Sequence, residues 1–243
     1  MKVIVREDAA AEVLRLRAQL DRMQGRSLDA PILPTHSALA GLLPGGGLRA
    51  GAAYALGPST SLLLSLLAAP SRTGSWCAVV GVPELGAEAA SDLGVDLSRL
   101  VLVPDPGPRW LAVAATLADV LPVVAVRPAG RVSDADASRF GARLRERNAV
   151  LLVQGVWPQA AASIGLESPE WSGLGAGDGY LRSRALTVSV QTRQAGVPRR
   201  ARLLLPDPAG ALAGIASERA VATPDGVVAE REPAAVPLLR AVG

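Results

Sequence analysis

Hydrophobic residues in the central part of the chain fall into short apolar runs separated by stretches of helical spacing. The runs at 51–56, 76–82, 100–103, 123–126 and 149–156 are apolar almost throughout, which is typical of strands buried on both faces. The stretches between them predict helices over 59–69, 84–93, 108–120 and 134–147. This alternation predicts an α/β fold with a mainly parallel sheet flanked by helices.

The pattern changes after residue 157. Residues 157–179 are rich in Gly, Ser and Pro and are too long for an ordinary connection, so we expect a functional or mobile loop there. The stretches "RALTVSVQTRQ" and "RRARLLLP" flank residues 195–198 and predict a C-terminal β-hairpin. A second, weaker hairpin is expected to turn at residues 224–226.

Residues 8–24 have the spacing of an amphipathic helix, which would form an N-terminal arm. Its apolar stripe consists of Val13, Leu16, Leu20 and Met23. Two interpretations stay open: the stripe packs on the chain's own domain, or it forms a face for a partner or for a homo-oligomer. The Gly- and Pro-containing stretch that follows, up to residue 37, predicts a linker.

Composition restricts the chemistry that the chain can perform. The formal net charge is only +3, so the overall balance does not by itself indicate nucleic acid. Cys77 and His36 are each the single residue of their type, which excludes an internal disulfide and Cys- or His-rich metal sites. The N-terminus lacks the apolar core of a signal peptide, and no run approaches the ~20 residues of a membrane span. We therefore expect a cytoplasmic protein without a membrane contact or a metal.

The stretch "GPSTSLLL" follows the run at 51–56 and has half of a phosphate-binding loop. A working P-loop, G-x-x-x-x-G-K-[ST], uses glycines to wrap phosphates, a lysine to neutralise them and a hydroxyl to hold Mg²⁺. Gly57 matches the first glycine, but Leu62, Leu63 and Leu64 stand at the Gly, Lys and Ser/Thr positions. Lys2 is the only lysine in the chain and lies in another segment. ATP hydrolysis at this loop is therefore not expected, and no cofactor is predicted.

The stretch "LLPGGGLRAGAAYALGPSTS" resembles the RecA recombinase family, in which a Gly-rich segment, a strand and a Gly-Pro-initiated Walker A loop follow in this order. "WCAVVGVPELGAEAASDLGVDLSRLVLVPD" and "RLRERNAVLLVQGVW" resemble later segments of the same family. The resemblance implies a degenerate RecA-like core over 38–206, between the arm and linker at 1–37 and a tail or hairpin at 207–243. RecA proteins end the Walker B strand in Asp, whereas "VVAVRP" places Arg127 near that position, where a cation cannot hold Mg²⁺. Glu84 lies near the position of the family's catalytic glutamate.

A RecA-like core of this size without its ATPase residues is most similar to the ImuA family, in particular its actinobacterial ImuA-prime branch. This resemblance implies a non-catalytic pseudo-ATPase subunit of a DNA-damage-induced translesion synthesis mutasome, with roles in the SOS response and induced mutagenesis. The implied partners are an ImuB-like inactive Y-family polymerase and an error-prone polymerase of the C family. The implied location is the cytoplasm, with nucleoid association when the subunit is engaged.

Basic residues suggest a contact with single-stranded DNA. RecA-like proteins face DNA with two loops, which the resemblance places at about 127–137 and 157–179. The candidate contacts there and in the acid-free stretch at 180–205 are Arg127, Arg131, Arg182, Arg184, Arg199 and Arg200. The alternative is that arginines at alternating strand positions form a solvated face.

Two other functions remain open from the sequence. One is a divergent RecA-type ATPase acting in recombination, which the missing lysine disfavours. The other is a cell-division inhibitor, a role attached by resemblance to small RecA-like relatives.

Overall fold

A computed structural model of the chain describes residues 30–174, 178–193 and 195–215. The predicted helix at 8–24, with its apolar stripe of Val13, Leu16, Leu20 and Met23, lies outside the described residues. The predicted turn at residues 224–226 also lies outside them. The expectations for these two segments stay predictions.

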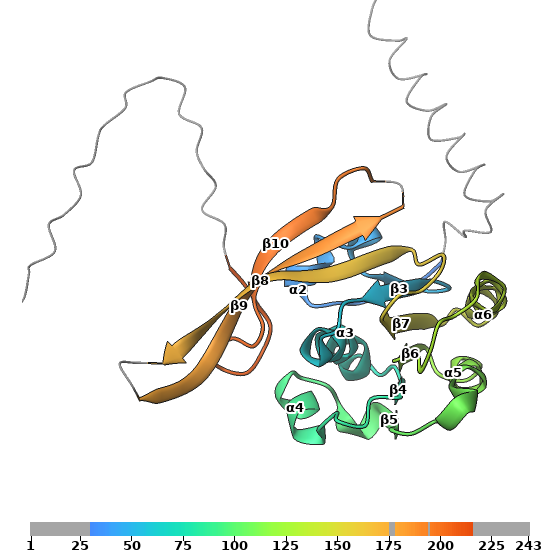
Figure 1. The fold of residues 1–243 in the computed structure, drawn as a ribbon, viewed down its shortest axis with the longest axis horizontal. Coiled ribbons are helices and arrows are strands. Elements are labelled where there is room, and N and C mark those ends of the chain that lie inside the picture. The colour runs from blue at the N-terminus through green and yellow to red at the C-terminus, as the bar shows by residue number, and fades with distance from the viewer. Residues whose placement is uncertain (1–29, 175–177, 194, 216–243) are drawn as a thin grey trace, which may run out of the picture.

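The described residues form a mixed α/β fold built on one large sheet (Figure 1). Its strands lie in the order β11-β10-β9-β8-β3-β7-β6-β4-β5. The parallel part consists of β3 (Ala53–Leu56), β4 (Cys77–Val80), β5 (Leu100–Val103), β6 (Val123–Val126), β7 (Val150–Gln154) and β8 (Ala162–Leu174). The antiparallel part adds β9 (Gly179–Thr192), β10 (Arg199–Leu204) and β11 (Ala213–Gly214) to the outer side of β8.

Helices cover both faces of the parallel part, as the sequence predicts. The main helices are α3 (Thr60–Arg72), α4 (Ala87–Asp92), α5 (Trp110–Ala118) and α6 (Asp134–Arg147). Helices α3 and α4 contribute to one apolar cluster, together with Tyr54 and Leu56 of β3. Helices α5 and α6 contribute to a second cluster, together with Ala53 and Ala55 of the same strand. Because successive residues of a strand point to opposite faces, β3 separates two cores.

A short N-terminal segment closes the first core. It consists of β1 (Ile32–Leu33), α2 (Ser37–Ala40), the 3₁₀ turn η1 (Pro44–Gly46) and β2 (Leu48–Arg49). Strands β1 and β2 pair antiparallel as a separate two-stranded sheet. Leu39, Leu43 and Leu48 are buried in the cluster that α3 and β9 share. This segment therefore covers the antiparallel part of the sheet on the α3 side.

Local sequence signals set the helix boundaries. Helix α6 begins after Ser133, whose hydroxyl accepts a hydrogen bond from the Asp136 amide at 3.1 Å. It ends at Asn148, which has the left-handed conformation that often terminates helices. Its bounds are those predicted from the sequence. Two 3₁₀ turns, η2 (Leu97–Arg99) and η3 (Gly107–Arg109), lead into β5 and α5.

The predicted loop at 157–179 is wrong, because most of these residues form strands. Strand β8 is 13 residues long, pairs parallel with β3 at its start and antiparallel with β9 along its length. Ser168 and Pro169 fall at a register shift between Glu167 and Glu170, so the ladder absorbs the proline at a bulge. The Gly- and Ser-rich composition concealed a strand that pairs with β9 along its length and with β3 at its start. The predicted hairpin that follows is confirmed as the pair β9 and β10.

The Phe140→Ala variant should lose about 3–5 kcal/mol of unfolding free energy, because it removes a buried ring from the second core. Phe140 is 4% exposed and packs edge-on against Trp157 at 5.7 Å between ring centroids. Chemical denaturation followed by circular dichroism measures the loss. The control is Val120→Ala, whose side chain is 75% exposed and which should leave stability nearly unchanged.

Candidate functional site at the carboxyl edge of the sheet

The carboxyl ends of β3, β4, β6 and β7 meet at one edge of the sheet, because these strands run parallel. This edge is where open α/β sheets ordinarily bind ligands. Gly57 follows β3 and Arg127 follows β6, with β7 between the two strands. The fold therefore brings both halves of the degenerate nucleotide site predicted from the sequence to the same edge.

The turn between β3 and α3 is too short to wrap a phosphate group. Only residues 57–59 separate the strand from the helix, and Ser59 is the N-cap residue. The Ser59 hydroxyl accepts a hydrogen bond from the Leu62 amide at 3.2 Å, and the Ser59 carbonyl accepts one from the Leu63 amide at 3.1 Å. The Gly57 amide donates to the Ile164 carbonyl at 2.9 Å. These amides are used within the chain, whereas a P-loop directs its amides at the ligand.

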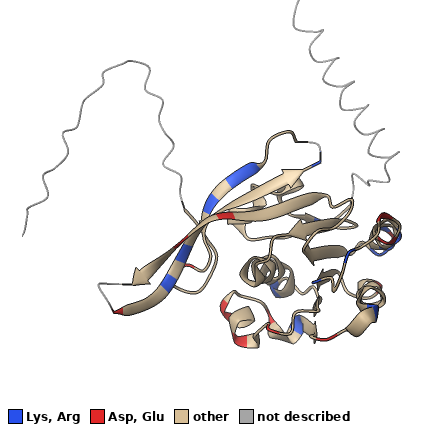
Figure 2. Cartoon of the chain, viewed as in Figure 1, with Lys and Arg blue, Asp and Glu red and all other residues tan. Residues whose placement is uncertain are grey.

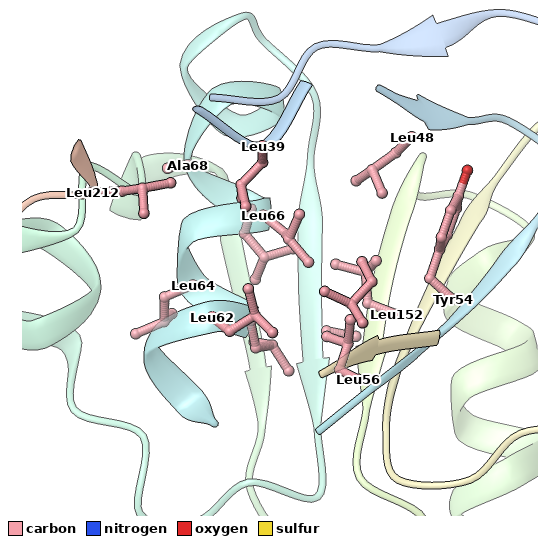
Figure 3. Packing of buried hydrophobic residues seen from close by; sticks show 14 of the residues in the cluster. Leu39, Leu48, Tyr54, Leu56, Leu62, Leu64, Leu66, Ala68, Leu152 and Leu212 are labelled. Carbon is pink, nitrogen blue, oxygen red and sulfur yellow. The ribbon is translucent and has the colours of Figure 1, made fainter. Parts of the chain in front are cut away.

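The three leucines that stand at the Gly, Lys and Ser/Thr positions belong to the core. Leu62 and Leu63 are 0% exposed, and Leu64 is 1% exposed. Leu62 and Leu63 lie in the first turn of α3 and Leu64 follows them. All three belong to the apolar cluster that also holds Leu56 and Leu152, and Figure 3 shows Leu62 and Leu64 within it. The leucines therefore line the interior of the domain and not a surface for a partner.

Arg127 ties the ends of three strands together. Its guanidinium contacts a Glu84 carboxylate oxygen at 2.5 Å, and its Nε donates to Gln154 Oε1 at 2.8 Å. Glu84 follows β4, Arg127 follows β6 and Gln154 ends β7. The sequence resemblance led us to expect a metal-binding carboxylate near this position, and the structure places a guanidinium there. Gln154 was not identified from the sequence, because its role depends on the pairing of β6 with β7.

The Glu84 carboxylate is stabilised in its charged form. The hydrogen bond from Arg127 is the main cause that lowers the pKa of Glu84, and a bond to the backbone of Glu84 itself adds to it. Arg127 thus has a counter-charge within the chain. The positive charge of Arg127 is therefore balanced by Glu84 and does not need the phosphates of a nucleotide as counter-charge.

Arg184 lies at the other side of this edge, beside the first turn of α3. Its guanidinium donates to the Ser61 hydroxyl at 2.8 Å and to the Leu205 carbonyl at 2.8 Å. It also lies over the Trp171 ring at 5.2 Å from the centroid. Burial lowers the pKa of Arg184. The sequence indicated Arg184 only as a basic residue, and its contact with α3 spans 123 positions of the chain.

The arginines that the sequence groups as DNA contacts do not form one patch (Figure 2). Arg127 is paired with Glu84, and Arg200 is paired with Glu167 at 3.3 Å on the outer strands. Arg131 is exposed in the loop after β6, and Arg199 is exposed on β10. Arg182 and Arg184 lie on β9, where the ladder continues beyond the end of β10. Their positions define separate surfaces.

The described residues offer little else for catalysis. Among residues 30–174, 178–193 and 195–215, no three His, Cys, Asp or Glu side chains come together in a way that could hold a metal ion. Cys77 is buried in β4, and burial raises the pKa of its thiol to about 12, so it is a poor nucleophile. Within the same part of the chain, no helix has the length and apolar character that crossing a bilayer requires.

Fold and site together define a mixed α/β domain with buried leucines and an internal ion pair at the carboxyl edge of its parallel strands. Residues 41–159, which include this edge from Gly57 to Gln154, match the family described as the MT3502 N-terminal domain. The chain is also 36% identical over 166 residues to the uncharacterized protein Rv3395c of Mycobacterium tuberculosis, covering 65% of this chain and 79% of that protein. The chain therefore belongs to the family of Rv3395c.

The Glu84→Gln variant tests the ion pair through its pH dependence. The folded pKa of Glu84 is lowered, so the pair stabilises the fold above the unfolded pKa of about 4.3 and ceases to do so as the pH falls through the folded value. Wild type should therefore melt above Glu84→Gln at pH 7, and the two melting temperatures should converge as the pH falls below the lowered folded pKa of Glu84. The control is Glu88→Gln on α4, whose carboxylate makes no ion pair with another described residue. Equal melting temperatures of wild type and Glu84→Gln at pH 7 would contradict the assignment.

Proposed function

We propose that the chain is a non-catalytic, RecA-like accessory subunit of a DNA-damage-induced translesion synthesis mutasome. Its proposed partners are an ImuB-like inactive Y-family polymerase and an error-prone C-family polymerase. It would act in the cytoplasm, at the nucleoid when engaged. The resemblance of the segments around "GPSTSLLL" and "VVAVRP" to the RecA and ImuA families supports this assignment.

The observation that carries the proposal is the filled edge of the sheet. A nucleotide would need the space and the amides at the start of α3, and both are used within the chain: Leu63 is 0% exposed, and Ser59 accepts bonds from two amides of the first turn. A Mg²⁺ ion would need an anionic ligand after β6, where Arg127 is bound to Glu84 and Gln154. Each change alone opposes ATP chemistry. Together they favour a protein that keeps the architecture for binding other macromolecules.

The sheet order supports the RecA-like part of the proposal. The two strands that carry the degenerate motifs, β3 and β6, run parallel to β7 between them and end at the same edge. A single nucleotide site requires such convergence, because the loop after one strand binds phosphate and the residue after the other binds its metal. A chain whose two motifs were unrelated would not need to bring them together.

Isolation of the full-length chain from its own cells after DNA damage tests the assembly. We expect an ImuB-like protein to co-purify and to be identified by mass spectrometry, because a non-catalytic subunit acts through its complexes. The same isolation from undamaged cells is the control. Recovery of a tubulin-like division protein in place of the polymerase relatives would instead indicate a cell-division inhibitor.

The purified chain should not hydrolyse ATP, with or without single-stranded DNA, in an assay for released phosphate. Turnover in wild type that disappears in Glu84→Gln would contradict the proposal and favour a recombination ATPase. Substituting Leu62→Gly, Leu63→Lys and Leu64→Thr together should not create turnover, because Arg127 remains at the metal-binding position.

The single variant Leu63→Lys should unfold or melt far below wild type, because it places a charge in the core. The matched control is Leu63→Met, which keeps the apolar volume and should cost less than about 1.5 kcal/mol.

A further inference from the structure

The outer half of the β8–β9 hairpin projects from the body of the domain (Figure 1). Strand β10 ends at Leu204, which pairs with Ala185, and the backbone of Arg184 still bonds to Leu205 and Pro206. Beyond this base, the ribbon of residues 171–174 and 179–184 is two-stranded. We call these residues the hairpin arm, or simply the arm, as distinct from the predicted N-terminal arm. Its large apolar side chains are exposed: Trp171 by 49%, Leu174 by 66%, Tyr180 by 71% and Leu181 by 50%. Exposed apolar side chains gathered on one element indicate a binding surface.

One face of the arm has arginines alternating with aromatic rings. Trp171 pairs with Arg184 across the two strands, and Arg182 and Tyr180 follow Arg184 at every second position of β9. Residues at alternate positions lie on the same face of a strand. Arg184 lies 5.2 Å from the Trp171 ring centroid, and Arg182 lies 5.4 Å from that of Tyr180. We call these four residues the arginine–aromatic stripe.

The arginine–aromatic stripe is cationic, although the β8–β9 hairpin also carries acidic residues elsewhere. Glu170 pairs with Ala185 in the ladder and therefore lies on the opposite face, where its carboxylate binds Arg202. The other acid among the described arm residues and their flanks is Asp178, an exposed residue that precedes β9 at the tip. The guanidiniums of Arg182 and Arg184 thus contact rings and hydrogen-bond acceptors without an ion pair among the described residues.

The base of the stripe is rigid. Arg184 is held by the Ser61 hydroxyl and the Leu205 carbonyl, each at 2.8 Å, so its guanidinium and the ring above it have a fixed position. The two strands also approach closely in the arm, since a Cβ on Gly173 would collide with the backbone of Tyr180 and Arg182. Binding groups that are fixed in advance lose less conformational entropy when a ligand arrives.

We propose that the arginine–aromatic stripe binds single-stranded DNA, with bases stacked on Trp171 and Tyr180 and phosphates neutralised by Arg182 and Arg184. Single-stranded nucleic acid offers both a polyanionic backbone and flat unpaired bases, and proteins bind it with this combination of groups. An acidic peptide would satisfy the arginines and leave the rings without a stacking partner. The inference rests on the proposed function and deepens it by assigning the DNA contact to the projecting hairpin, whose base lies beside the first turn of α3.

The spacing of the rings determines the size of the ligand. Tyr180 and Arg184, the partner of Trp171, are four positions apart on β9, which corresponds to about 13 Å along the strand. One nucleotide cannot reach both rings. The stripe should therefore bind an oligonucleotide and should not bind a mononucleotide measurably at the same concentration.

Fluorescence anisotropy of a labelled oligothymidylate with the full-length chain tests this site. The double variant Trp171→Ala with Tyr180→Ala should bind at least about tenfold more weakly than wild type, because each base loses its stacking surface. The matched control is Trp76→Ala, which removes a 43% exposed tryptophan with its own arginine, Arg99, 5.9 Å from the ring. The control should bind like wild type. Circular dichroism of each variant shows that the fold is kept.

A second measurement isolates the phosphate contact. Arg182→Ala should lower the slope of log affinity against log salt by about one relative to wild type. The control for this measurement is Arg99→Ala, which should leave the slope unchanged. Poly-glutamate should fail to displace the oligonucleotide at equal charge concentration.

Three results would overturn the inference: no binding of oligothymidylate by wild type, equal binding by wild type and the double variant, or displacement by poly-glutamate as effective as by unlabelled DNA. The last result would assign the stripe to acidic peptides. The co-purification experiment with polymerase relatives is repeated with the double variant, and its result is evaluated separately from DNA binding. Loss of DNA binding with the protein complex intact supports the stripe, and DNA binding without any such complex refutes only the proposed function.

Discussion

The structure depends on the burial of the first two turns of α3 against the centre of the sheet. Leu62, Leu63, Leu66 and Leu67 are all 0% exposed and join the cluster that contains residues of β3, β4, β6 and β7. Burying each leucine stabilises the fold by roughly 1.5–3 kcal/mol, so the set outweighs any single surface contact. In a nucleotide-binding fold the same turns must leave room for phosphate. In this chain the start of α3 is packed with leucine side chains, so it cannot also leave room for phosphate.

The buried leucines and the internal ion pair both stabilise the carboxyl edge of the parallel strands. Removing a ligand from the edge of a sheet leaves strand ends and dipoles that need other partners. Ser59 satisfies the amides at the start of α3, while Arg127 connects Glu84 with Gln154 across three strand ends. Side chains of the chain itself thus hold this edge together. Such a domain is well suited to hold its shape in the absence of a nucleotide.

The sequence predicted the parallel half of the fold well, because that half is built from local patterns. Apolar runs and helical spacing located β3 to β7 and α3 to α6, and Ser133 marked the start of α6. The same reasoning failed at β8, where Gly, Ser and Pro conceal a strand that pairs with the next strand, β9, and at its start with the distant β3. Gln154 and the contact of Arg184 with Ser61 were missed for a related reason. Both depend on which strands become neighbours, and composition does not encode that information.

The hydrogen bond between Arg184 and Ser61 connects the projecting hairpin with helix α3. Arg184 stands on β9 where the two-stranded ribbon leaves the sheet, and Ser61 stands in the turn of α3 that holds the buried leucines. The Leu205 carbonyl fixes the same guanidinium from the other side. The ribbon is therefore fixed at its base to the helix that carries the buried leucines. A displacement of the hairpin relative to the domain would have to break these two hydrogen bonds.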